Sequence, residues 1–174
     1  VRGGKFLSRI YSSNNTIEIL FKSDNTIDGG TNFERILNTI EVKNGSTVLN
    51  TIDFTYTIDH GTTYAQRFFL DKVEFNKDFG ANYQHYRFQY NDPVALPNRF
   101  SNSQDGMGYF NGKDNLDGML PIFDFNTIPE EHKLDLNRII TGQFTANRDT
   151  DFNYKQKGVL EKIYYPTGGY TAID

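Results

Sequence analysis

The chain has 174 residues, of which 37% are hydrophobic and 15% aromatic, and its 22 acidic and 18 basic residues give a formal net charge of -4. This length suffices for one domain with a self-supporting core, and an apolar content rich in rings favours strands over helices. The absence of Cys excludes disulfides, thiolate metal sites and Cys nucleophiles, and the lack of a Lys/Arg run argues against nucleic acid as a partner.

A repeated β-hairpin is the first predicted element. Four segments share the order apolar residue, Leu, two variable residues, then Ile or Val: 6–10, 36–40, 69–73 and 159–163. The first three are each followed by an alternating apolar segment, namely Ile17, Ile19 and Phe21, then Ile52, Phe54 and Tyr56, then Tyr86, Phe88 and Tyr90. Alternation with period 2 is typical of a strand that buries one face. We therefore expect hairpins at about 5–22, 35–58, 68–91 and 158–174.

The breaks inside these hairpins have turn chemistry. Each of the four contains Asn or Gly, which tolerate positive φ: 13–15, 44–46, 78–82 and 166–169. A meander with accidental similarity between its hairpins is the alternative to true duplication. Because the fourth return strand stops at Asp174 and the chain opens on Val1, we expect a piece of a longer protein.

Residues 91–158 break the repeat. Pro93 and Pro97 stop the ladder, and residues 101–118 form a loop rich in Gly, Asn and Asp. Two short helices are predicted, at 129–132 and at 150–158, the second capped by Asp149 or Thr150 and terminated by Gly158. The expected fold is a single all-β domain, 1–174, with an antiparallel sheet of hairpins, curved or in a sandwich, and this irregular insertion.

Hard oxygen donors gather in the insertion. Asp105, Asp114 and Asp117, with Asn111 and Asn115 between them, are candidate ligands for Ca²⁺. Their spacing does not fit an EF-hand loop, which places oxygens at alternate positions and ends on a Glu. The alternative is a turn-rich loop in which Asn and Asp bind their own backbone.

The same loop contains the candidate ligand-binding residues Tyr109, Phe110 and Asn111. Exposed rings beside amides could stack on a sugar or on a protein surface, whereas the alternating aromatics of the hairpins are expected to be core. A carbohydrate-binding module is therefore one hypothesis for the function.

Catalytic motifs are missing from the sequence. His60, His85 and His132 have no zinc-site spacing, and there is no G-x-S-x-G elbow, phosphate-binding loop or G-x-G-x-x-G motif. We predict no catalytic residues and no cofactor apart from the candidate Ca²⁺. A hydrolase is a further hypothesis for the function. It would need two converging carboxylates in a pocket.

No apolar stretch reaches the roughly 18 to 20 residues of a membrane helix, and residues 1–20 do not follow the order of a signal peptide. We expect no membrane span in this chain, and an export signal, if the protein is exported, would lie upstream.

The second half contains six further motifs: Tyr86–Asp92, Leu96–Pro97, Ser103–Asp105, Gly108–Lys113, Ala146–Arg148 and Tyr165–Thr171. Together with the hairpin repeat, they resemble the RHS/YD-repeat family, in particular the region just before the repeats of the large exported RHS-like proteins of Bacteroidetes-type bacteria. The resemblance covers most of residues 69–174. Gly106–Met107 stands where the family usually has His-Trp. The resemblance implies a non-catalytic structural scaffold, exported or attached to the cell surface. Its expected partners are the rest of the parent polypeptide and a glycan or protein at the surface.

Overall fold

The structure is a computed structural model that describes residues 6–14, 16–24, 36–59, 66–78, 80, 83–115, 118, 129 and 146–173. Contacts divide the chain into two units. The first comprises Val1–Pro93 and Val159–Asp174, and the second comprises Val94–Gly158.

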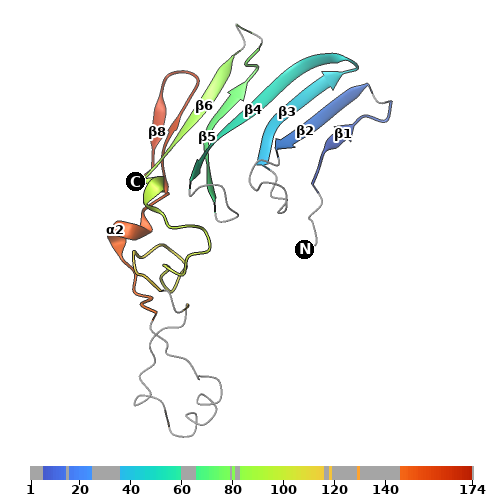
Figure 1. Ribbon diagram of the computed structural model, residues 1–174. Coiled ribbons are helices and arrows are strands. Elements are labelled where there is room, and N and C mark those ends of the chain that lie inside the picture. Colours follow the sequence, from blue (N-terminus) through green and yellow to red (C-terminus); the bar gives the residue numbers. More distant parts are fainter. Residues whose placement is uncertain are drawn as a thin grey trace. The chain divides into compact units, whose positions relative to one another are not determined.

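Unit 1 is an antiparallel sheet whose eight strands follow one another in chain order (Figure 1). The strands are β1 (Arg9–Tyr11), β2 (Ile17–Asp24), β3 (Ile36–Asn44), β4 (Thr47–Asp59), β5 (Arg67–Phe75), β6 (Gln84–Tyr90), β7 (Leu160–Tyr164) and β8 (Tyr170–Ala172). The predicted all-β fold with an antiparallel sheet of hairpins is confirmed. β1–β2, β3–β4, β5–β6 and β7–β8 are the hairpins.

Register divides the sheet into an apolar and a polar face, because directly opposed residues point to the same side. One apolar row joins Phe21, Ile40, Ile52 and Phe75 across four strands. The neighbouring polar row is Lys22, Thr39, Asp53, Glu74 and His85. All four residues of the apolar row are half-buried.

Four register shifts interrupt the ladders, and each leaves one extra residue on the later strand of a pair. The extra residues are Asn38, Leu49, Asp71 and Glu161. Such β-bulges bend a strand and increase its right-handed twist. The labelled strands in Figure 1 accordingly rotate in direction from β1 to β8, which agrees with the predicted curved sheet.

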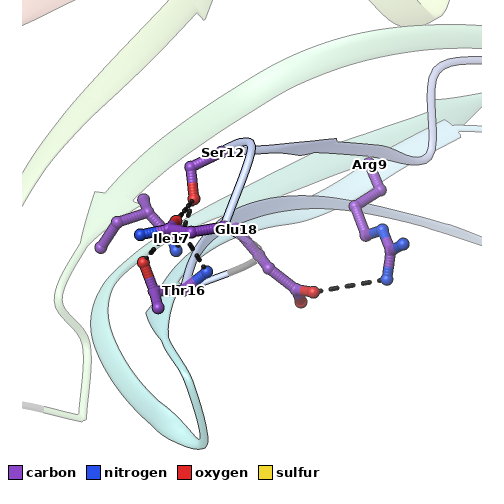
Figure 2. A network of polar contacts seen from close by, with 6 residues as sticks. Arg9, Ser12, Thr16, Ile17 and Glu18 are labelled. Atoms are coloured by element: carbon purple, nitrogen blue, oxygen red, sulfur yellow. Dashed lines mark hydrogen bonds and ion pairs between the residues drawn. The ribbon is translucent and has the colours of Figure 1, made fainter.

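The turns between the paired strands match their sequences where the structure describes them. Gly45 has a φ of 56° in the two-residue loop between β3 and β4, and Gly168 has a φ of 90° between β7 and β8. The turn between β1 and β2 is closed by Ser12 and Ile17 (Figure 2). The N–H of Ser12 donates to the Ile17 carbonyl at 2.9 Å, and the N–H of Ile17 donates to the Ser12 hydroxyl at 3.2 Å.

Among the described residues, two helices border or lie in unit 2. They are the 3-10 helix η2 (Pro93–Ala95) and the helix α2 (Phe152–Lys155). The predicted helix at 129–132 lies outside the described residues except for Pro129.

The predicted cap of the second helix is wrong. The N-cap is Asp151, whose carboxylate accepts the Asn153 N–H at 3.0 Å. The Thr150 hydroxyl donates to Asp105 instead. The helix ends at Lys155 with Gln156 as C-cap, before Gly158, whose φ is 73°.

Candidate functional site

The loop with the candidate site residues is built around the side chain of Asp105. One carboxylate oxygen accepts the backbone N–H groups of Met107 and Tyr109, at 2.8 and 2.9 Å. Gly108 closes the same turn with a φ of 92° and donates its N–H to the Asp105 carbonyl at 3.1 Å. A short carboxylate that binds the backbone a few residues ahead is how Asp specifies a tight turn.

The second oxygen of Asp105 reaches a distant part of the chain. It accepts the hydroxyl of Thr150 at 2.9 Å, and Arg148 donates to the Asp105 carbonyl. Only 1% of the surface of Asp105 is exposed. Burial alone would raise the pKa of this carboxyl, but the hydrogen bonds from Thr150 and from three backbone N–H groups outweigh it, so the pKa lies below its ordinary value.

Unit 2 is therefore expected to lose stability in acid. Because the folded-state pKa of Asp105 is depressed, its contribution is present above the unfolded pKa and is lost as the pH falls through the folded value, below about pH 4. Hydrogen exchange of residues 102–115 across this range measures the loss. Asp105→Asn should flatten the pH dependence of the exchange in this loop. An unchanged acid profile in that variant would contradict the assignment to Asp105.

Two buried asparagines complete a polar interior in this unit. Asn111 is 0% exposed and donates from its amide nitrogen to the carbonyls of Asn147 at 2.8 Å and Asp149 at 3.1 Å. Asn115 is 4% exposed and both donates to and accepts from the backbone of Asn147, at 3.2 and 2.9 Å. These amides attach the loop to the segment that precedes α2.

The candidate Ca²⁺ ligands have different surroundings. Both carboxylate oxygens of Asp105 are bonded within the protein, Asp114 is exposed, and Asp117 lies outside the described residues. Where the structure describes the chain, it contains no group of three His, Cys, Asp or Glu residues that could hold a metal. The Ca²⁺ site stays a prediction.

The candidate ligand-binding residues also differ. Tyr109 is 57% exposed, whereas Phe110 is half-buried with its ring edge-to-face on Tyr154, at 5.2 Å between centroids. A Cβ at Gly112 would meet the Tyr154 ring at 2.5 Å, so the glycine allows this ring to lie close to the loop. Asn111 uses its amide for the contacts given above. Of the two rings, that of Tyr109 is more open to a ligand.

A pair of carboxylates on the sheet was not predicted. Asp53 and Glu74 are directly opposed on β4 and β5, and both line a pocket of about 520 Å³. The Thr39 hydroxyl donates to Asp53 at 2.8 Å. Glu74, 4% exposed, accepts the Tyr83 hydroxyl at 2.8 Å and is paired with Lys72 at 3.1 Å. Alternation placed Asp53 on the polar face, but its partner depends on a register that the sequence does not show.

The protonation of this pair bears on its chemistry. Burial raises the pKa of Glu74, but the hydrogen bonds from Tyr83 and Lys72 outweigh it, so the pKa lies below the ordinary value. A glycosidase needs one carboxyl with a raised pKa to act as the general acid. The pKa of Glu74 is shifted in the opposite direction, which argues against that role.

Of the three histidines, the structure describes His85. His85 is exposed on β6 and stacks on Tyr83 at 5.4 Å between centroids. His60 and His132 lie outside the described residues. None of the described helices is long and apolar enough to cross a membrane.

Comparison with protein-family models, with curated proteins and with solved structures found no match for this chain.

Proposed function

We propose that the chain is a non-catalytic structural module of a larger, exported or cell-surface protein of the RHS type. The observation that carries this proposal is the connectivity of the sheet. Every strand pairs only with the strands next to it in the sequence, so each hairpin adds to the one before it. The RHS resemblance, which covers most of residues 69–174, supports the same role.

The energetics of such a sheet suit a scaffold. A single hairpin cannot bury its apolar face and is marginal by itself, so its stability comes from its neighbours. The cross-strand apolar row from Phe21 to Phe75 joins three consecutive hairpins in this way. A serial arrangement of this kind extends a rigid surface without requiring a binding cleft.

An activity screen separates the scaffold from a hydrolase. The chain is incubated with chromogenic glycosides and esters, next to the variants Glu74→Gln and, as a control on β7, Glu161→Gln. We expect no turnover above buffer in any of the three proteins. Turnover by the parent chain that Glu74→Gln abolishes and Glu161→Gln retains would overturn the proposal and make the Asp53–Glu74 pair the active site.

A carbohydrate-binding module is the second candidate, favoured by the exposed ring of Tyr109 on a turn held by Asp105. A glycan array with the parent chain and Tyr109→Ala tests it. Binding that disappears in Tyr109→Ala but survives in Tyr170→Ala, which removes another exposed ring, would favour this role over the scaffold alone.

A further inference from the structure

The hairpin β5–β6 opens into a fork at one end. Only Lys72–Phe75 of β5 and Gln84–Arg87 of β6 are paired, although β5 begins at Arg67 and β6 continues to Tyr90. Beyond the last pair, side chains connect the two strands. The rings of Phe69 and Tyr90 are edge-to-face at 5.1 Å, and the Tyr90 hydroxyl donates to the Leu70 carbonyl at 3.0 Å.

A pocket of about 350 Å³ lies at this fork, within the range of small-ligand sites. Three rings line it, those of Phe69, Phe88 and Tyr90, together with Thr57, Asp71 and Pro93. Asp71 is the extra residue of the β5 bulge, and bulges beside binding sites commonly redirect a side chain. The lining thus combines aromatic surface with one carboxylate.

Asp71 supplies the negative charge of this lining. Its carboxylate accepts the Thr57 hydroxyl, but it has no ion-pair partner in the part of the chain that the structure describes. Arg87 also lines the pocket, yet its guanidinium lies over the Tyr164 ring, at 4.3 Å from the centroid. Burial raises the pKa of Tyr90, and the negative charge of Asp71 raises it further, which indicates that the carboxylate acts on this ring.

We propose that the fork between β5 and β6 binds a quaternary or methylated ammonium group. The faces of aromatic rings attract cations, and several rings around one position form the aromatic cage that recognises such groups. Asp71 supplies the opposing charge, while the methyl groups fit an apolar lining better than they fit water. A primary ammonium or a metal ion keeps its hydration more strongly and is the poorer ligand for such a lining. This site is independent of the structural role proposed above.

The first test compares cations with a neutral alcohol that has nearly the shape of choline. Tetramethylammonium and choline are titrated into the full chain by NMR, beside 3,3-dimethylbutan-1-ol, which replaces the choline nitrogen with carbon and carries no charge. We expect saturable shifts for the two cations at Phe69, Phe88 and Tyr90, and at least about tenfold weaker binding of the neutral alcohol. Equal binding of choline and the alcohol, or no saturable shift with the cations, would overturn the proposal.

Variants then assign the binding to the fork. Asp71→Asn keeps an oxygen for the Thr57 hydroxyl but removes the charge, and Phe69→Leu removes one ring. Each should weaken choline binding by about tenfold, whereas Tyr170→Leu, which removes an exposed ring elsewhere on the sheet, should not. Circular dichroism and the unfolding midpoint of each variant show whether it is folded. Full choline binding by folded Asp71→Asn and Phe69→Leu would overturn the assignment.

The same chemistry occurs on lipid or glycan headgroups and on modified proteins. Glycerophosphocholine and a peptide with trimethyl-lysine are therefore titrated in parallel, the second against its unmethylated form. Tighter binding of either compound than of tetramethylammonium supports the site and identifies its source. Equal binding of the methylated and unmethylated peptides would contradict the recognition of methyl groups.

Discussion

Proline at Ile52 is expected to cost about 3 kcal/mol of unfolding free energy beyond the cost of alanine at the same position. Ile52 lies in β4 and is paired on both sides, with Ile40 of β3 and Phe75 of β5. Proline removes the N–H that an inner strand donates to its neighbour, and proline is found in sheets essentially at edges and bulges. Ile52→Ala accounts for the loss of the side chain.

The matched control is proline at Tyr170, compared with Tyr170→Ala. Along β8, the backbone N–H and C=O groups of successive residues point alternately toward β7 and away from it. The Tyr165 N–H donates to the Gly169 carbonyl and the Ile173 N–H donates to the Glu161 carbonyl, so residues 169 and 173 are among those whose backbone groups point toward β7. In that alternation the N–H of Tyr170 points away from β7, so proline there should cost less than about 1 kcal/mol beyond alanine. Urea unfolding followed by tyrosine fluorescence measures all four variants. Equal costs at the two positions would contradict the strand order.

How far the sequence predicts the sheet is clear from β6. The alternation of Tyr86, Phe88 and Tyr90 with Arg87 and Gln89 matches the alternation of half-buried and exposed residues in the structure. Periodicity reports which face a residue takes, because successive side chains of a strand point to opposite sides. It does not report register. The opposition of Asp53 and Glu74 and the bulge at Asp71 therefore could not be predicted, although each determines what a pocket contains.

The insertion shows a different limit. An Asn in a Gly-rich loop has the same local sequence whether it faces a ligand or the interior, so the sequence makes Asn111 only a candidate ligand-binding residue. The structure buries it completely, with its amide bound to the backbone near Asn147. A buried amide is stable when its polar atoms are bonded, and the bonds of Asn111 to Asn147 and Asp149 cross 36 and 38 positions of sequence. Contacts at such separations have no local signal.

The polar interior of unit 2 should be as sensitive to truncation as an apolar core. Asn111→Ala removes the donor to the carbonyls of Asn147 and Asp149 and the acceptor for the Lys113 N–H, which lies at 3.2 Å. Each buried partner left unsatisfied costs about 1–3 kcal/mol. Since water can enter and replace part of these bonds, we expect a total loss of about 3 kcal/mol, larger than most single substitutions cause.

Asn153→Ala is the control, because that asparagine is exposed on α2, and its effect should stay within about 0.5 kcal/mol. Asn111→Asp sharpens the test. This variant keeps the acceptor for the Lys113 N–H but turns a carboxylate oxygen toward the carbonyls of Asn147 and Asp149. We therefore expect it to destabilise unit 2 at neutral pH. Part of the stability should return when acid protonates the new carboxylate. Hydrogen exchange of residues 102–115 reports the opening of the loop. If Asn111→Ala exchanged no faster there than Asn153→Ala, other contacts would hold the loop, and Asn111 would be available for a ligand after all.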